Sequence, residues 1–118
     1  MTVGTEWLVD AQGCRADALR DLAAVRALLE KVLLRLELRV VGQGLWHEFG
    51  GEGGVTGIYL LTESHLSVHT YPEHGVATLN LYCCRPRPEF PWEEELSAAL
   101  GATTVVVRVV DRAPEGKA

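Results

Sequence analysis

The segment from Leu19 to Leu36 most constrains the fold, because its apolar residues recur at the spacing of one helix face. Charged residues fill the positions between them, as on the solvent side of an amphipathic helix. Asp17 lies where a helix cap is expected. The pattern predicts one long helix that begins near Asp17 and covers a core. Its apolar positions are Leu19, Leu22, Ala23, Val25, Leu28, Leu29, Val32, Leu33 and Leu36.

The rest of the chain is typical of short strands with one further helix. Trp92–Leu100 predicts that second helix, with Pro91 near its first turn. This order predicts the α+β class, a two-layer sandwich in which an antiparallel sheet carries two helices on one face. The other face would stay partly apolar, which favours a homodimer. Strands are expected at 6–11, 36–45, 55–61, 66–70, 76–84 and 103–110.

Length and composition exclude several classes of protein. The 118 residues predict a single domain over 1–118, with a flexible polar tail at 112–118. A net charge of -5 and scattered basic residues argue against a nucleic-acid partner. No apolar run has the length of a membrane span, and the start of the chain lacks the features of a secretory signal. Three cysteines without regular spacing suit a reducing compartment, so a cytoplasmic location is expected.

Reactive side chains concentrate between Thr62 and Gly75. This segment holds a carboxylate beside a serine and three of the four histidines of the chain. Apolar runs flank it on both sides, and Cys83 and Cys84 close the run that follows. A small domain rarely gathers so many reactive groups merely to pack a core, so the segment indicates a functional site.

Ser64 could cut its own backbone. Its hydroxyl can attack the carbonyl of Glu63 to give an ester, and β-elimination then leaves a dehydroalanine that hydrolyses to a pyruvoyl group. The reaction needs a proton acceptor, and His69 is a candidate because histidine titrates near neutrality. An isolated Glu-Ser-His triplet is more typical of a capped turn. Cleavage between Glu63 and Ser64 is favoured by the motif around it.

The whole segment resembles the signature of the bacterial S-adenosylmethionine decarboxylase family, the small, self-processing, pyruvoyl-dependent type. Residue types and spacings agree over more than twenty positions, and the chain length agrees too. The matching residues are Glu63-Ser64-His65-Leu66, His69-Thr70, Pro72-Glu73-His74-Gly75 and Cys84, with His47, Phe49 and Gly54-Val55-Thr56-Gly57 upstream and, more weakly, Leu8-Val9 and Gly13-Cys14.

The resemblance implies catalytic roles for three residues. The serine at Ser64 becomes the pyruvoyl group, which forms a Schiff base with the substrate amine and withdraws electrons as carbon dioxide leaves. His69 assists self-cleavage. Cys84 supplies a proton to the α-carbon, a role that suits a thiol. Because neighbouring strand residues face opposite sides, Cys83 is expected to pack in the core.

The resemblance also implies a substrate site. Glu73 would bind ribose hydroxyls and Phe49 would stack on adenine, although a packing role for Phe49 is equally expected. Thr56 keeps the hydroxyl of a serine that usually supports processing. Structural roles are expected for the remaining histidines, His47, His65 and His74. The family further implies a homodimer whose sites use residues of both subunits. No metal site is predicted, because the residues that flank His65 and His69 are typical of strand and turn and the usual second pair of ligands is missing.

Departures from the family pattern leave the substrate open. They are Thr5-Glu6-Trp7-Leu8 near the start, Tyr71 for tryptophan, Asn80 for aspartate and Arg85 for glycine. S-adenosylmethionine, decarboxylated to the aminopropyl donor for spermidine synthesis, is the expected substrate. L-arginine or L-ornithine is the alternative, since Glu6 or Asp10 could pair with a distal cation.

Two other classes of protein stay open at this point. A metal protein could use His65 and His69, which are four residues apart. A non-catalytic binding module is also compatible with an α+β sandwich, because such folds host many functions. Processing at Ser64 distinguishes the enzyme from both.

Overall fold

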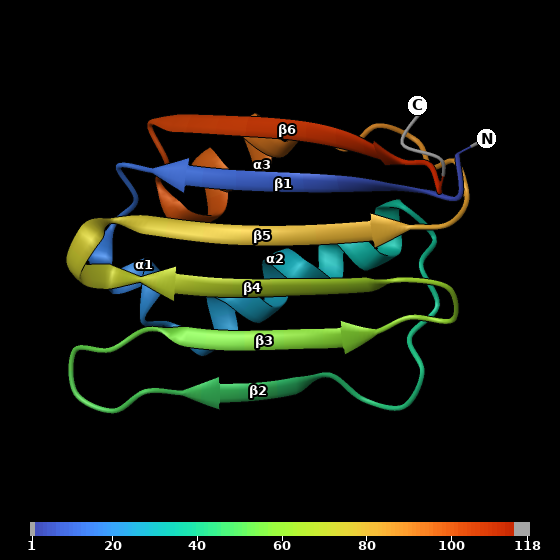
Figure 1. Ribbon diagram of the computed structural model, residues 1–118. Helices are drawn as coiled ribbons and strands as arrows, with labels where there is room; N and C mark the ends of the chain where they lie inside the picture. Colours follow the sequence, from blue (N-terminus) through green and yellow to red (C-terminus); the bar gives the residue numbers. More distant parts are fainter. Residues whose placement is uncertain (1, 115–118) are drawn as a thin grey trace.

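One antiparallel sheet of six strands, in the order β2-β3-β4-β5-β1-β6, forms the front layer of the molecule, and the helices lie behind it (Figure 1). The computed structural model describes residues 2–114. The elements are β1 (Gly4–Gln12), α1 (Ala16–Leu19), α2 (Leu22–Arg35), β2 (Leu45–Glu48), β3 (Val55–Leu60), β4 (His65–Tyr71), the 3-10 helix η1 (Pro72–His74), β5 (Val76–Cys83), α3 (Trp92–Leu100) and β6 (Thr104–Arg112). The predicted α+β sandwich is therefore confirmed, with a third, short helix added.

Alternation along the strands separates the two faces of the sheet. In β5, Ala77, Leu79, Leu81 and Cys83 are buried against the helices, and the residues between them point to the opposite side. We call that opposite side the outer face. The helices complete the core with Val25, Leu29 and Val32 of α2 and with Leu96 and Leu100 of α3.

The predicted first helix is interrupted. α1 ends at Leu19, and α2 begins at Leu22 after Asp21, whose side chain accepts a hydrogen bond from the amide of Ala24 at 3.3 Å. Asp21 therefore caps a new helix instead of continuing the old one, which is the usual behaviour of a short acidic side chain at this position. The second helix has the predicted bounds, Trp92–Leu100.

The predicted strand at 36–45 is wrong. Leu36 still closes α2 through its amide, and Glu37 has a positive φ of 54° that ends the helical path. The chain then crosses to the edge of the sheet and makes only an isolated bridge between Val40 and Leu61. Gly42 and Gly44 interrupt the alternation, so regular pairing begins only at Leu45.

Two local features fix the end of β4 that leads into η1. The buried hydroxyl of Thr70 donates to the carbonyl of Leu19 at 2.7 Å and accepts from the amide of Val55 at 2.8 Å. Gly75 ends η1 with φ 65°, a left-handed conformation that glycine adopts without strain, and lets the chain return as β5. This end of the sheet is thereby tied to α1.

The C-terminal end of the chain differs in part from the predicted flexible tail. The predicted tail at 112–118 starts inside β6 at Arg112, and its last four residues lie outside the described part. Over residues 2–114, none of the helices combines the length and the apolar character needed to traverse a lipid bilayer.

Candidate active site

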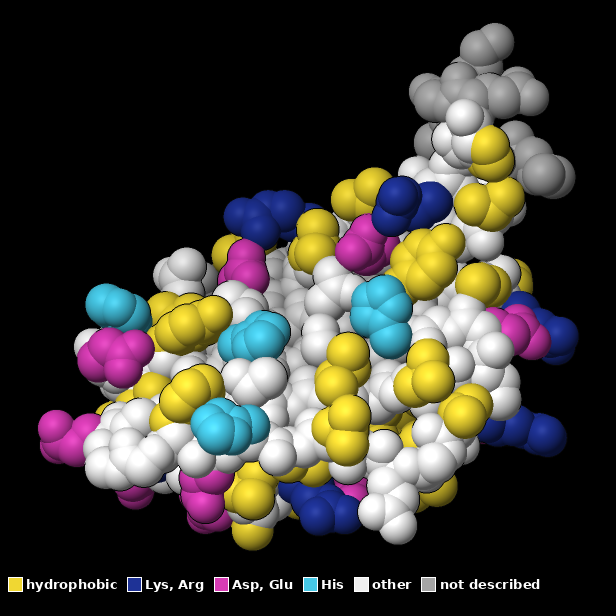
Figure 2. All heavy atoms as spheres, turned by 60° about the horizontal axis from the view of Figure 1, so that its bottom comes forward, with side chains coloured by type: hydrophobic (Ala, Val, Ile, Leu, Met, Phe, Trp, Pro, Cys, Tyr) yellow, Lys and Arg dark blue, Asp and Glu magenta, His cyan; other side chains and the backbone are white. Residues whose placement is uncertain are grey.

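The outer face carries the reactive side chains. Figure 2 views this face obliquely and shows histidine, acidic and hydrophobic side chains interspersed over it. Register places them in rows across the sheet: Thr56 lies opposite His69, and His65 lies opposite Tyr82. The candidate residues fall into two groups on this face, one at each end of β4.

The first group surrounds the turn between β3 and β4. The amide of Leu61 donates to the carbonyl of Ser64 at 3.0 Å and closes the turn, in which Ser64 is half-buried. The exposed thiol of Cys84 donates to the carbonyl oxygen of Glu63 at 2.6 Å. A donor thus lies on the carbonyl group that the Ser64 hydroxyl would attack. We call Glu63, Ser64 and Cys84 the cleavage group.

The two adjacent cysteines face opposite sides, as strand alternation predicted. Cys83 is buried in the core with 1% of its surface exposed, whereas Cys84 is exposed. Burial raises the pKa of the Cys83 thiol, and the nearby Arg87 opposes that rise. Cys83 therefore behaves as a small core residue, and Cys84 is the thiol available to the site.

The second group lies at the other end of β4. The hydroxyl oxygen of Thr56 and Nδ1 of His69 are 3.1 Å apart, a hydrogen-bond distance. Phe49 is half-exposed and packs edge-on against His47, with ring centroids 4.6 Å apart. Glu73 is exposed in η1, which directly follows β4. We call Phe49, Thr56, His69 and Glu73 the histidine group.

The two groups do not meet within one chain. Ser64 precedes β4, and His69 is the fifth residue of that strand. Four residue steps of about 3.3 Å put His69 roughly 13 Å from His65, and farther from Ser64. The expectation that His69 lies beside Ser64 as its proton acceptor is therefore not met in a single chain. The same spacing prevents His65 and His69 from sharing a metal ion, whose ligands lie near 2 Å.

Glu6 is already engaged. Its carboxylate accepts from Nδ2 of Asn80 at 2.9 Å and from Arg112 at 3.3 Å. Asn80 in turn lies 3.1 Å from Nε2 of His65, which gives that histidine the structural role expected of it. The other acidic candidate, Asp10, accepts from Arg108 at 2.7 Å. These partners come from strands distant in the sequence, so spacing along the chain could not identify them.

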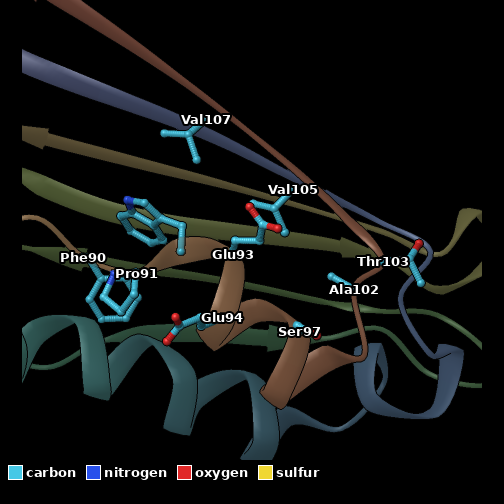
Figure 3. Close-up of a pocket in the computed structure, with 10 residues that line it drawn as sticks. Phe90, Pro91, Glu93, Glu94, Ser97, Ala102, Thr103, Val105 and Val107 are labelled. Atoms are coloured by element: carbon cyan, nitrogen blue, oxygen red, sulfur yellow. The ribbon is translucent and has the colours of Figure 1, made fainter.

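A cavity of about 650 Å³ lies away from both groups. It is bounded by α3 and β6, with Phe90, Pro91 and Glu93 on one side and Val105 and Val107 on the other (Figure 3). This places it on the helix side of the sheet edge, and none of the reactive residues described above lines it. It offers no site for the chemistry of Ser64.

Comparison with known proteins identifies the relatives of this chain. A family model described as S-adenosylmethionine decarboxylase matches residues 5–113. A protein of Aquifex aeolicus named S-adenosylmethionine decarboxylase proenzyme is 39% identical over 83 residues, which cover 70% of this chain and 60% of that protein. A protein of the same name from Moorella thermoacetica is 32% identical over 124 aligned positions, which cover 98% of this chain and 95% of the relative.

Solved structures show the same similarity. The crystal structure of the adenosylmethionine decarboxylase from Aquifex aeolicus superposes with a TM-score of 0.77 at 28% identity. The superposition covers 99% of this chain and 97% of that one. Sequence and fold therefore agree over nearly the whole molecule.

Proposed function

The chain belongs to the S-adenosylmethionine decarboxylase family, and from that premise we propose that it is a self-processing, pyruvoyl-dependent enzyme of polyamine biosynthesis. It decarboxylates S-adenosylmethionine to the aminopropyl donor for spermidine synthesis. The observation that carries the proposal is the thiol of Cys84 on the carbonyl oxygen of Glu63, next to Ser64.

Self-cleavage uses the cleavage group. The Ser64 hydroxyl attacks the carbonyl carbon of Glu63, and the peptide C–N bond breaks to leave an ester. The Cys84 thiol stabilises the charge that develops on the carbonyl oxygen. Loss of the Ser64 α-proton then breaks the Cβ–Oγ bond and releases Glu63 as a carboxylate. Water hydrolyses the remaining dehydroalanine, releases ammonia and leaves the keto group of a pyruvoyl residue.

The residues around Ser64 fit such a group. The pyruvoyl keto group supplies an electron sink when it condenses with the substrate amine, so that carbon dioxide can leave. Cys84 is exposed and, after cleavage, no longer has a scissile carbonyl to bind. Its thiol is then free to protonate the α-carbon of the substrate, which is the role proposed from the sequence.

The proton acceptor for cleavage comes from a second copy of the chain. His69 lies roughly 13 Å along β4 from the start of the strand, too far to reach Ser64 in its own subunit. A two-fold pairing of outer faces places the histidine group of one subunit against the cleavage group of the other. The outer face suits such a contact, because Leu45, Ile58 and Leu60 are 71%, 43% and 59% exposed.

The substrate contacts are divided in the same way. Phe49 and Glu73, proposed for adenine and ribose, belong to the histidine group, so they would contact the adenosine part of a substrate held at the pyruvoyl group of the partner. Thr56 holds His69 and so supports processing. Glu6 lies across from Tyr82 at the Ser64 end of the face. Glu6 is paired with Arg112, so it can contact the substrate, as we propose, only when that ion pair opens.

The comparisons favour S-adenosylmethionine over arginine or ornithine, because the relatives carry that substrate in their names. They also favour an enzyme over a metal protein or a passive binding module. For the cytoplasmic location, which we retain as part of the proposal, support comes from three cysteines that are all free thiols.

Two measurements on purified protein test the proposal. Intact-mass analysis under denaturing conditions should find two fragments, cut between Glu63 and Ser64, the second carrying a pyruvoyl end. Release of carbon dioxide from S-adenosylmethionine should exceed release from arginine and ornithine. An uncut chain without a reactive carbonyl, or turnover confined to arginine or ornithine, contradicts it.

A further inference from the structure

A pocket of about 630 Å³ lies against the residue whose peptide bond the proposed cleavage breaks. The amide of Thr62 donates to the carbonyl of Arg39 at 3.0 Å, which fixes the segment before the scissile bond on the wall of the pocket. Three arginines converge here with two glutamates. We call this site the arginine pocket; its charged residues are Glu37, Arg39, Glu63, Arg85 and Arg87.

The arginines are not equally engaged. Arg85 already binds the side chain of Glu63, with Nε 2.7 Å from Oε2. Arg87 is anchored through Nη1, which lies 3.4 Å and 3.5 Å from the carbonyl oxygens of Leu36 and Glu37. Its Nε atom is buried and, over residues 2–114, has no partner at hydrogen-bond distance, although Arg87 lies close enough to the buried Cys83 thiol to oppose the rise in the pKa of that thiol. A buried cationic donor without an acceptor is costly, so it points to an acceptor that arrives later.

The net charge of the pocket also favours the binding of an anion. Three arginines against two glutamates give one positive charge in excess. Cleavage adds one negative charge, the α-carboxylate of Glu63. Ordinary proteolysis would also create a nearby ammonium, but here the other new end is a pyruvoyl group without charge. The new carboxylate therefore needs a counter-ion from the surrounding residues.

We propose that the arginine pocket binds the α-carboxylate that self-cleavage creates on Glu63. Arg85 keeps its hold on the Glu63 side chain, and Arg87, with Arg39, receives the new carboxylate. The end of the N-terminal fragment then stays fixed in the arginine pocket instead of moving freely, and the Cys84 thiol is released from it. This inference rests on the proposed self-processing, since the carboxylate exists only after cleavage.

Digestion of the processed protein with a carboxypeptidase tests the binding. The mass of the N-terminal fragment reports how fast Glu63 is removed. Arg87→Gln and, separately, Arg39→Gln should speed its removal roughly fivefold, the scale of one lost ion pair. Arg87→Lys should give an intermediate rate. Arg26→Gln is the control, because it removes an arginine outside the pocket, one that pairs with Glu30 on α2 at 3.1 Å. It should leave the digestion rate unchanged.

A second readout follows the carboxyl itself. With carbon-13 glutamate in the processed protein, the titration of the Glu63 α-carboxyl should occur at lower pH in the parent than in Arg39→Gln, because a nearby arginine favours the ionised form. Equal digestion rates and equal titration in parent and pocket variants would overturn the pocket proposal while cleavage stands. A chain that stays uncut overturns the self-processing and the pocket together, and the mass spectrum distinguishes the two results.

Discussion

The thiol of Cys84 lies 2.6 Å from the carbonyl oxygen of Glu63, on the peptide bond that precedes Ser64. One cysteine therefore contacts the precursor at the bond to be broken. In the proposed mechanism, the same side chain later faces the substrate. Cys84 therefore takes part in both self-cleavage and decarboxylation, and substitutions can distinguish its effects on the two reactions.

Ser64→Ala should give a folded, uncut and inactive protein. The change removes the hydroxyl that attacks Glu63 and leaves the surrounding turn in place. Mass spectrometry should find one full-length chain, and carbon dioxide release from S-adenosylmethionine should fall to background. Ser97→Ala, on the exposed side of α3, is the control and should process normally. Appreciable turnover by Ser64→Ala would contradict the mechanism.

Cys84→Ala should reduce decarboxylation by about 10²-fold or more, the usual scale for loss of a proton donor. Cleavage should still occur, but more slowly, because the contact to the Glu63 carbonyl is lost. Cys83→Ala should instead lower the free energy of unfolding by about 1 kcal/mol, as expected for a small core truncation, and keep turnover. Decarboxylation assays and urea unfolding on both variants measure these effects. The reverse pattern would show that the two thiols have been assigned the wrong way round.

Co-expression of Ser64→Ala with His69→Ala should restore cleavage that neither variant shows efficiently alone. A mixed dimer holds one site with an intact Ser64 from one subunit and an intact His69 from the other. With equal expression and random pairing, about half of the His69→Ala chains should be cut. Mass spectrometry of the mixture measures this fraction. If His69→Ala matures at the normal rate by itself, His69 does not assist cleavage.

Alkylation should distinguish the three free thiols. Burial raises the pKa of Cys83 and of Cys14, so both hold less thiolate at pH 8 than an ordinary cysteine. Cys84 is exposed and should react first with iodoacetamide in the folded Ser64→Ala protein. Peptide mass analysis at increasing pH should show Cys14 and Cys83 labelled only at higher pH or after unfolding. Early labelling of Cys83 would show that its side chain is not in the core.

Glu95→Gln should destabilise the protein at pH 7 and have little effect in acid. Glu95 accepts from Lys31 at 2.9 Å and from Arg35 at 3.2 Å, and the hydrogen bond from Lys31 is the main cause that lowers its pKa. A lowered pKa in the folded state gives stability above the ordinary pKa of about 4.3, which is lost as pH falls through the folded value. Urea midpoints for parent and variant at pH 7 and pH 3 measure this. A difference that persists at pH 3 would contradict the ionic origin.

Local patterns predicted most of the fold but not the arrangement of the site. The alternation of β5 correctly predicted that Cys83 and Cys84 face opposite sides of the sheet. The predicted bounds of α3 were correct because Pro91 and Gly101 lie at the two ends of a segment with clear helical apolar spacing. The break at Asp21 was missed because its cap competes with an uninterrupted helical pattern. Proximity in sequence also suggested that His69 is near Ser64, although an extended strand separates them.

The ion pair between Glu63 and Arg85 had no sequence signal at all, since it joins residues 22 positions apart through two strand ends. Such contacts follow from register and not from local spacing. The same is true of the series of hydrogen bonds from Glu6 through Asn80 to His65, which crosses three strands. These residues mark the part of the site that only the assembled sheet defines.

The position of β1 determines what becomes of the molecule once it is cut. A break after Glu63 leaves β1, β2 and β3 on one fragment and β4, β5 and β6 on the other, yet β1 is hydrogen-bonded to β5 on one side and β6 on the other. The two fragments are thus interleaved in a single sheet, and they cannot separate without breaking three strand pairings: β1 with β5, β1 with β6, and β3 with β4. Maturation should leave the native particle unchanged in size, and the cut should become visible only when the protein is denatured.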